Sequence, residues 1–210
     1  MSQGPDRERA VEQYRRTAAS YDRHMWFARG THGEAVARLE LEPGQVVLDV
    51  ACGTGLNFDG IQERIGPGGR LIGLDLSPDM LAIARRRVEA AGWGNVTLVE
   101  AAAEDAALPA APDALLFAFT HDVLRSPAAL DNLLAGAGPG ARVVSAGGKW
   151  PPRWAVPVHA YVRFQAPRYV TTMEGFDRPW TLLAERVRDL EVKQRSLGGA
   201  YVAWGQAPGG

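Results

Sequence analysis

The feature that most constrains this chain is an apolar run of strand length that leads into a glycine loop and then into a helix. The run is Val46–Val50, the loop reads Asp49-Val50-Ala51-Cys52-Gly53-Thr54-Gly55, and the helical stretch covers 56–65. Gly53 and Gly55 permit a tight turn and a close approach of the backbone to a ligand, while the helix N-terminus offers free N–H groups. Such a unit predicts an α/β sheet with a ligand site at the carboxyl ends of its strands.

The alternation of short apolar runs and helical stretches continues along the chain. Runs that are apolar along their whole length, with helices between them, indicate a parallel sheet that is covered on both faces. The further strands expected are 71–75, 96–99, 113–119 and 142–146, with helices over 77–91 and 127–135. Ser77-Pro78-Asp79 is typical of a helix start, and Gly92 of a helix end.

The C-terminal part has a different pattern. A helical stretch over 180–190 is followed by two strand-like stretches, 191–197 and 200–204, with Gly198-Gly199 between them. Two strands joined by a tight glycine turn form an antiparallel hairpin. We therefore predict a doubly wound α/β fold whose seven-stranded, mostly parallel sheet ends in a C-terminal antiparallel hairpin.

Composition narrows the classes of protein. The 210 residues fit one soluble domain, and a net charge of −1 gives no global positive field for nucleic acid. Cys52 is the only cysteine, so the chain forms no internal disulfide. The N-terminus lacks the apolar core of a signal peptide, and no run of about 18 apolar residues occurs. We therefore expect a cytoplasmic protein that acts on a small molecule; no metal site is expected, and the sequence indicates no oligomeric state.

A second motif indicates the kind of ligand. Asp75 ends the second strand, where a carboxylate can accept hydrogen bonds from both hydroxyls of a ribose. A dinucleotide-binding loop needs a third small residue, but that position holds Phe58 or Leu56, depending on the residue from which the pattern is read. A Gly-Lys-Ser/Thr phosphate loop is absent as well. An acidic residue that opens the loop, here Asp49, suits the amino group of a methionine moiety better than it suits a pyrophosphate.

The two motifs together resemble those of class I S-adenosylmethionine (SAM)-dependent methyltransferases. The matching runs are Val47-Leu48-Asp49-Val50-Ala51-Cys52-Gly53-Thr54-Gly55 and Gly73-Leu74-Asp75-Leu76-Ser77-Pro78-Asp79-Met80-Leu81. The branch that looks most similar includes quinone-biosynthesis methyltransferases and phosphatidylethanolamine N-methyltransferases. The resemblance covers roughly the first two-thirds of the chain, and it implies a Rossmann-like methyltransferase fold with SAM as the cofactor.

The resemblance also implies roles for individual residues. Asp49 and the backbone of the glycine loop would hold the methionine part, Asp75 the ribose, and Leu76 and Met80 the adenine. The family's next motif often reads Asp-Ala and then an acidic residue, whereas this chain has Ala102-Ala103-Glu104. The expected cofactor-binding residues are Tyr14, Tyr21, Asp49, Ala51, Gly53, Gly55, Asn57, Asp75, Leu76, Met80, Ala103, Glu104 and Thr120.

The reacting groups are expected where the fourth strand ends, at Phe119-Thr120-His121-Asp122. His121 can take a proton from an amine or a hydroxyl at neutral pH, and Asp122 can orient that imidazole or hold a cationic amine. The alternative is that Asp122 caps the next turn and that His121 packs nearby. Together with Tyr21, His121 and Asp122 are the catalytic residues that we expect.

A helical lid is expected over residues 1–30. Its apolar stripe consists of Val11, Tyr14, Ala18, Tyr21 and Met25, at helical spacing. The two tyrosine rings could face the sulfonium of the cofactor, since a ring face attracts a cation. Plain packing of this helix on the sheet is the alternative.

A second cover is expected over residues 149–180, a stretch rich in aromatic residues and proline. An apolar, aromatic wall suits an apolar or a cationic acceptor. The interleaved Arg153, Arg163 and Arg168 would also suit an anionic membrane surface, so peripheral membrane contact stays open as a hypothesis. A hydrophobic cluster that braces the lid is the alternative.

The leading functional hypothesis is a SAM-dependent methyltransferase that acts on an amine, or less readily an oxygen, of a small metabolite or lipid headgroup. Methyl transfer from a sulfonium mainly requires an aligned acceptor and the exclusion of water, so the absence of a catalytic triad is no objection. A first alternative is an enzyme of the same fold that transfers or cyclises the aminobutyrate chain and releases methylthioadenosine. A second alternative is a non-catalytic nucleotide-binding protein.

Overall fold

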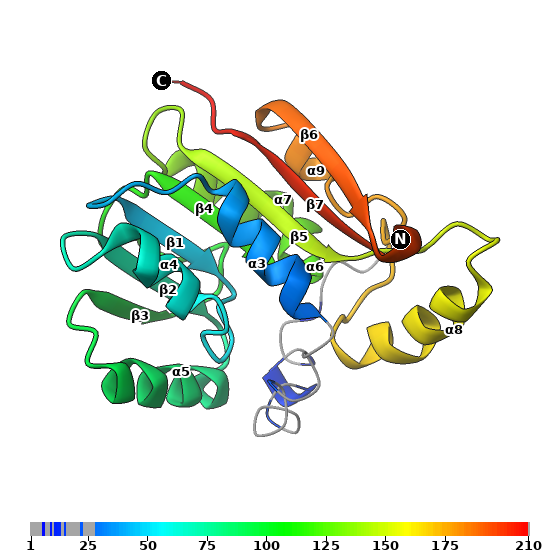
Figure 1. The fold of residues 1–210 in the computed structure, drawn as a ribbon, viewed down its shortest axis with the longest axis horizontal. Coiled ribbons are helices and arrows are strands. Elements are labelled where there is room, and N and C mark those ends of the chain that lie inside the picture. Colours follow the sequence, from blue (N-terminus) through cyan, green and yellow to red (C-terminus); the bar gives the residue numbers. More distant parts are fainter. Residues whose placement is uncertain are drawn as a thin grey trace.

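A single mixed sheet of seven strands organises the chain, in the order β3-β2-β1-β4-β5-β7-β6 (Figure 1). The computed structural model describes residues 6, 9, 11–13, 15, 22 and 28–209. The first five strands in this order pair in parallel, and β7 pairs antiparallel with both β5 and β6. The strands are β1 (Val46–Val50), β2 (Arg70–Asp75), β3 (Val96–Glu100), β4 (Ala114–Ala118), β5 (Arg142–Gly148), β6 (Arg188–Arg195) and β7 (Ala200–Gln206). The predicted fold class is confirmed, including the antiparallel hairpin at the C-terminus.

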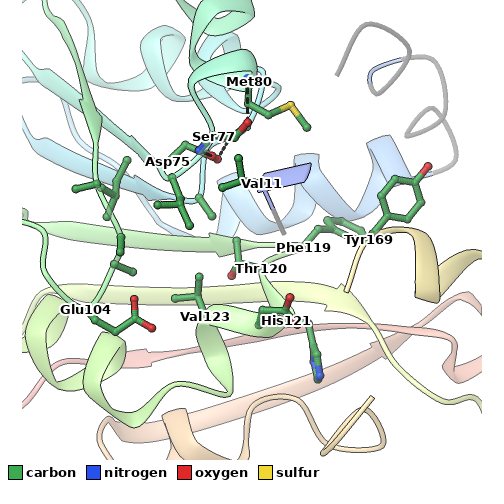
Figure 2. Close-up of a pocket in the computed structure, with 18 of the residues that line it drawn as sticks. Val11, Asp75, Ser77, Met80, Glu104, Phe119, Thr120, His121, Val123 and Tyr169 are labelled. Carbon is green, nitrogen blue, oxygen red and sulfur yellow. Dashed lines mark hydrogen bonds between the residues drawn. The ribbon is translucent and has the colours of Figure 1, made fainter. Parts of the chain in front are cut away.

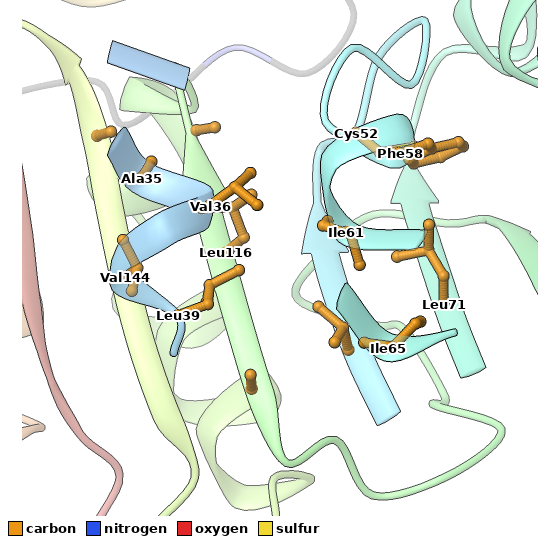
Figure 3. Close-up of a cluster of buried hydrophobic side chains, with 14 of the residues drawn as sticks. Ala35, Val36, Leu39, Cys52, Phe58, Ile61, Ile65, Leu71, Leu116 and Val144 are labelled. Atoms are coloured by element: carbon orange, nitrogen blue, oxygen red, sulfur yellow. The ribbon is translucent and has the colours of Figure 1, made fainter. Parts of the chain in front are cut away.

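One face of the sheet is covered by three helices, α3 (Arg29–Arg38), α4 (Phe58–Ile65) and α5 (Pro78–Ala91). Figure 3 shows the apolar side chains of α3 and α4 directed at the strands beneath them. Neighbouring residues of a strand point to opposite faces, so Val47 belongs to this core while Leu48 belongs to the other one. This alternation explains why strands that are apolar throughout lie in the middle of the molecule.

The opposite face is covered by α6 (His121–Leu124), α7 (Pro127–Ala135) and α9 (Thr181–Ala184). Leu130 and Leu133 of α7 pack there against Leu115 and Phe117 of β4, and all four side chains are fully buried. Each fully buried side chain of this size contributes about 1.5–3 kcal/mol of hydrophobic free energy. Two cores on one sheet therefore hold β1, β2 and β4 rigidly in the middle, and the carboxyl ends of these strands carry the site.

Helix α5 has the start and the end that its sequence predicts. The Ser77 hydroxyl accepts a hydrogen bond from the Met80 N–H, Pro78 occupies the first turn, and Gly92 ends the helix in the left-handed conformation with φ of 67°. Helix α7 starts in the same way: Ser126 is its N-cap, and Pro127 follows in the first turn.

The segment between β5 and β7 differs from the prediction. A helix over 180–190 is wrong: α9 covers only Thr181–Ala184, and β6 has begun by Arg188. The strand predicted over 191–197 is present as β6, but it begins at Arg188. Most residues of this edge strand are exposed, so no apolar alternation marks its beginning. The hairpin connection is the 3₁₀ turn η4 (Ser196–Gly198), in which Leu197 has a positive φ of 52°, instead of a turn made by Gly198 and Gly199 alone.

Candidate cofactor and acceptor site

The glycine loop follows β1 at the middle of the sheet. Its backbone turns sharply, with positive φ at Ala51 (48°), Gly53 (57°) and Gly55 (79°). A positive φ is unusual for alanine and costs conformational energy, which the surrounding contacts must offset. The loop is fixed by the Cys52 N–H, which donates to the Leu74 carbonyl of β2 at 2.9 Å. The strained turn therefore lies directly beside the end of β2.

The Asp75 carboxylate lies at the end of β2 and is 8% exposed. One oxygen accepts from the Gly53 N–H and the other from the Ser77 N–H, both at 2.8 Å. Burial raises the pKa of Asp75 to about 6. Each carboxylate oxygen can accept a further hydrogen bond, so the side chain is held in place and remains able to bind hydroxyls.

A first cavity opens beside this carboxylate. Figure 2 shows Asp75, Ser77 and Met80 on one side of it and Thr120, Val123 and Glu104 on the other. Its remaining walls are mostly apolar and include Leu74, Leu76, Phe119 and Ala101, Ala102 and Ala103. A carboxylate between apolar walls suits an adenosine, whose ribose hydroxyls donate hydrogen bonds and whose base needs flat apolar contacts.

The loop after β3 forms one wall of this cavity and is anchored from α7. Asn132 donates to the carbonyls of Ala103 and Ala106 at 2.9 and 3.0 Å. The Ser126 hydroxyl donates to Glu104 at 2.7 Å. The segment that contains the expected cofactor-binding residues Ala103 and Glu104 is thus held by a defined set of hydrogen bonds.

Asp49 belongs to a buried polar chain behind the cavity. It is 1% exposed, and the Asn57 amide donates to its two oxygens at 3.1 and 3.2 Å. Burial raises the pKa of Asp49 to about 7. The Asn57 oxygen is 2.7 Å from Nδ1 of His32, whose ring stacks on Phe119 with a centroid distance of 4.7 Å. The Asn57 amide nitrogen donates to Asp49, so it is the amide oxygen that faces His32 and accepts a hydrogen bond from its ring. Nδ1 of His32 therefore carries the proton.

The segment after β4 borders a second cavity as well as the first. Phe119 has a positive φ of 58°, and Phe119, Thr120, His121 and Tyr169 line both cavities. A strained, non-glycine residue at this place indicates that the surrounding structure imposes the turn, as it often does at functional sites. The hydroxyl of Thr120 is buried and has no hydrogen-bond partner in the described structure.

His121 is turned toward the second cavity. Figure 2 shows its ring directed away from Asp75 and Met80, and the ring meets Phe176, which lines only the second cavity, edge-on at 5.0 Å. Nε2 lies 3.1 Å from the Glu174 carbonyl, to which it must donate, so Nδ1 holds the lone pair. Nδ1 is buried without a partner among the described residues. Burial lowers the pKa of His121, and the neutral imidazole is favoured at pH 7.

Asp122 was expected to orient the His121 imidazole, but its hydrogen-bond partner is Thr171. Its carboxylate accepts from the Thr171 N–H and from the Thr171 hydroxyl, each at 2.8 Å to one oxygen. These bonds fix the segment that carries Tyr169 to the end of β4. A catalytic role for Asp122 remains a prediction, whereas its contact with Thr171 shows that it braces the wall between the cavities.

The second cavity lies under the segment that was expected to form an acceptor cover. Its apolar and aromatic lining includes Val158, Tyr161, Val162, Val170, Phe176 and Tyr201. Its polar lining groups are uncharged hydroxyls, an amide and the imidazole of His121, and no aspartate, glutamate, lysine or arginine belongs to the described lining. The fully buried Tyr201 hydroxyl lies 2.9 Å from the hydroxyl of Ser145.

The N-terminal segment meets the first cavity at the few positions that the structure describes. Asp6 and Val11 line it. Asp22 accepts a hydrogen bond from the Thr54 hydroxyl of the glycine loop and pairs with Arg87 of α5. Tyr14 and Tyr21 lie outside the described residues, so their roles at the cofactor remain predictions.

The structure brings most of the expected site residues to one cavity. Those that line it are Ala51, Gly53, Asp75, Leu76, Met80, Ala103, Glu104, Thr120, His121 and Asp122. Asp49, Gly55 and Asn57 lie behind the lining and support the loop. Three further residues line this cavity although none was assigned to the cofactor: Tyr169 belongs to the aromatic cover expected over 149–180, and Phe119 and Ser77 are neighbours of expected residues. In the part of the chain that the structure describes, no cluster of potential metal ligands occurs, and no helix is long and apolar enough to cross a bilayer.

Comparison with known proteins agrees with this geometry. Residues 47–148 match a family described as a methyltransferase domain. These residues form a class I SAM-dependent methyltransferase domain. A demethylmenaquinone methyltransferase of Geobacillus kaustophilus is 35% identical over 80 residues, which cover 38% of this chain and 32% of that protein. The chain thus matches about a third of the length of such curated relatives.

Two solved structures share the fold of the methyltransferase domain over nearly their whole length. The N-methyltransferase NodS of Bradyrhizobium japonicum, in complex with S-adenosyl-L-homocysteine (SAH), has a TM-score of 0.67 at 18% identity, covering 95% of this chain and 98% of that chain. A putative methyltransferase of Haloferax volcanii, in complex with the activator Trm112, has a TM-score of 0.71 at 17% identity, covering 96% and 98%. At these identities the likeness concerns the fold alone.

SAM is the cofactor of this family, and the residues of the first cavity fit it. The ionised Asp75 can accept the ribose hydroxyls, and Leu76 and Met80 offer an apolar surface to the adenine. The methionine part would lie along the loop from Ala51 to Gly53, toward the wall that is shared with the second cavity.

Proposed function

We propose that the chain is a methyltransferase that moves the methyl group of SAM onto an uncharged ring acceptor, a hydroquinone in the first instance. The observation that carries this proposal is the shared wall: Phe119, Thr120, His121 and Tyr169 line both the cavity that suits adenosine and the adjoining apolar cavity. A reacting methyl group would lie where the two cavities meet.

The chemistry of the second cavity favours an uncharged ring over a charged amine. Its described lining contains no carboxylate that could pair with an ammonium group, and a buried charge without a partner is costly. Flat apolar walls with a few hydroxyls suit a ring that carries one or two hydroxyl groups. The partial match to a demethylmenaquinone methyltransferase supports the same class of acceptor.

The residues at the shared wall can perform the proton transfers that such a reaction needs. SAM, when bound, supplies an electrophilic methyl group and leaves as SAH. Nδ1 of neutral His121 is buried, and a turn of the ring that exposes this atom to the second cavity would let it accept the proton of an acceptor hydroxyl, which raises the electron density on the neighbouring ring carbon. That carbon forms the new bond to the methyl carbon while the carbon–sulfur bond breaks and its electron pair stays on sulfur. Loss of the proton from the same ring carbon would restore the aromatic ring, and His121 would return its proton to the oxygen, so that one proton is released overall.

Product analysis with defined acceptors tests the proposal. The purified chain is incubated with SAM and a demethylated naphthoquinol that is kept reduced, and SAH and the methylated ring are quantified by mass spectrometry. We expect both to form in equal amounts. SAH formation that requires the quinol but yields a methoxy product would move the reaction from carbon to oxygen.

An amine acceptor is the second candidate, because the aromatic rings of the second cavity could also attract a cation. The same assay with a panel of primary and methylated amines distinguishes the two. SAH that forms with amines and not with quinols would overturn the ring-acceptor proposal. Methylthioadenosine that forms above a protein-free control would instead indicate aminobutyrate transfer or cyclisation.

A further inference from the structure

Helix α8 (Val156–Gln165) exposes apolar side chains on the side that faces away from the second cavity. Its inner side chains, Val158 and Val162, line that cavity. On its outer side, however, Val156 is 66% and Phe164 is 72% exposed, and Trp154 just before the helix is 71% exposed. Large apolar groups at such exposure, next to each other, indicate a surface that another apolar phase covers.

The exposed side chains form one continuous arc. At 100° per residue, Val156, Ala160, Phe164 and Pro157 fall within about a quarter to a third of the helix circumference. Arg163, the only residue of the helix with a permanent charge, flanks this arc. A helix that is apolar on its inner and on its outer side is not the pattern of an ordinary surface helix, which is polar where it meets water.

Within the chain segment that contains this arc, the charged side chains have one sign. Arg153, Arg163 and Arg168 are exposed, and no aspartate or glutamate occurs between Trp150 and Met173, although the chain has 24 acidic residues in 210. Arg153 and Arg163 form no ion pair within the described structure, and Arg168 donates to the Phe164 carbonyl at the end of the helix. We call these residues, Arg153, Trp154, Val156, Arg163, Phe164 and Arg168, the α8 surface.

The α8 surface also projects from the body of the molecule. Figure 1 shows α8 at the margin of the fold, beyond the carboxyl ends of the strands and apart from the helices that cover the sheet. A flat external surface can therefore approach it without contact with α4, α5 or α7.

We propose that the α8 surface docks on a bilayer that contains anionic phospholipid. The apolar side chains enter the interfacial region, and the arginines pair with lipid phosphates, as in amphipathic helices that lie in a membrane interface. The lack of carboxylates favours an anionic bilayer over a neutral apolar partner. A lipophilic acceptor would then reach the second cavity under the same helix, a consequence that rests on the proposed function, whereas docking itself does not.

Vesicle sedimentation of the purified chain tests docking without cofactor or acceptor. We expect binding to vesicles of phosphatidylglycerol and phosphatidylcholine, little binding to phosphatidylcholine alone, and weaker binding as NaCl rises from 0.05 to 0.5 M. The Trp154→Ser/Phe164→Ser variant should lose most of the binding. Arg163→Glu should weaken binding at least about fivefold, since one basic residue near such a surface contributes about 1 kcal/mol.

Matched controls keep the result specific. Arg86→Glu, at an exposed position of α5, changes the net charge by the same amount and should bind vesicles far better than Arg163→Glu. Circular dichroism and SAH affinity should be unchanged in all variants, because the substituted side chains are exposed and line neither cavity. Absence of binding to anionic vesicles at low salt would overturn the proposal. Equal binding to neutral vesicles would also overturn it. A dimer in solution that the Trp154→Ser/Phe164→Ser variant dissociates would overturn it as well, because a second copy of the chain would then cover the α8 surface.

Discussion

At the scale of single residues, the packing of the Phe58 ring against Gly55 and Gly73 determines which ligands the loop after β1 can bind. Phe58 is fully buried. A Cβ added at Gly55 would lie 2.7 Å from the Phe58 ring, and a Cβ added at Gly73 would lie 2.8 Å from it. The Phe58 ring therefore fills the space in which a dinucleotide-binding loop packs its third small residue. This is the physical reason that the loop pattern departs from the dinucleotide type.

We predict that Gly73→Ala destabilises the protein by about 1–3 kcal/mol through overpacking. The added methyl group would meet Phe58, and also the Cys52 sulfur and Leu98 at 3.0 Å. Phe58→Leu in the same chain should recover part of the loss, which urea unfolding of the two single variants and the double variant can measure. Gly94→Ala is the control, because a Cβ there meets no atom within 4 Å. Additive losses would show that Phe58 and Gly73 do not compete for space.

The pKa of Asp75 predicts how cofactor binding depends on pH. With a pKa of about 6, the carboxylate is mostly protonated at pH 5 and mostly ionised at pH 7. Ribose hydroxyls donate to the ionised form, so SAH should bind about tenfold more tightly at pH 7 than at pH 5. Calorimetric titration across this range measures the effect. Asp49 lies nearby and has a pKa of about 7, so the Asp75→Asn variant is needed to separate the effects of the two carboxyl groups. If this variant keeps the full pH dependence of SAH binding, the dependence belongs to Asp49.

The same raised pKa values have the opposite effect on the stability of the free protein. A carboxyl group whose pKa is higher in the folded than in the unfolded state stabilises the fold fully below the unfolded value, near 4, and this contribution is lost as the pH rises through the folded value. The free protein should therefore lose stability between about pH 4 and pH 7, in the range where SAH affinity increases.

A catalytic His121 predicts a separation of turnover from cofactor binding. In His121→Gln the amide N–H can still donate to the Glu174 carbonyl, but the side chain has no imidazole lone pair to accept a proton. We expect kcat/KM to fall by about 10²–10⁴, the usual contribution of general base catalysis, with unchanged SAH affinity. Full activity of His121→Gln would leave His121 as a lining residue only.

At the scale of elements, the units with local signals could be predicted, and those set by tertiary contacts could not. β1, the glycine loop and α4 follow each other in sequence, and Asp75 ends the next strand, so Gly53 and Asp75 could be expected at the same edge of the sheet. The beginning of β6 could not be placed, because an exposed edge strand with charged residues has no apolar face that marks its first residue. Tyr169 was expected only as part of the aromatic cover. Its place at the first cavity could not be predicted, because it depends on the contact between Asp122 and Thr171, which are far apart in sequence.

Asp22 of the N-terminal segment connects the glycine loop with α5, and the loss of its ion pair with Arg87 should loosen the first cavity. It accepts a hydrogen bond from Thr54 of the glycine loop and pairs with Arg87 of α5; Gly53 of this loop and Met80 of this helix line the first cavity. We predict that Arg87→Ala weakens SAH binding several-fold, chiefly through faster dissociation, while Arg85→Ala at an exposed position of the same helix does not. Stopped-flow dissociation of SAH measures the difference. Equal rates in both variants would limit Asp22 to a structural contact.

At the scale of the whole molecule, the two cores share one sheet, and the first cavity takes its lining from segments between Asp6 and Tyr169. We therefore predict one cooperative unfolding transition that shifts as a whole when ligand binds. SAH at about 100 times its Kd adds about 2.7 kcal/mol, and for a domain of this size the midpoint should rise by about 5–11 °C. Asp75→Ala should abolish the shift in differential scanning calorimetry. Two transitions, of which SAH moves only one, would instead mean that the segment around α8 and the C-terminal hairpin unfold apart from the domain that binds the cofactor.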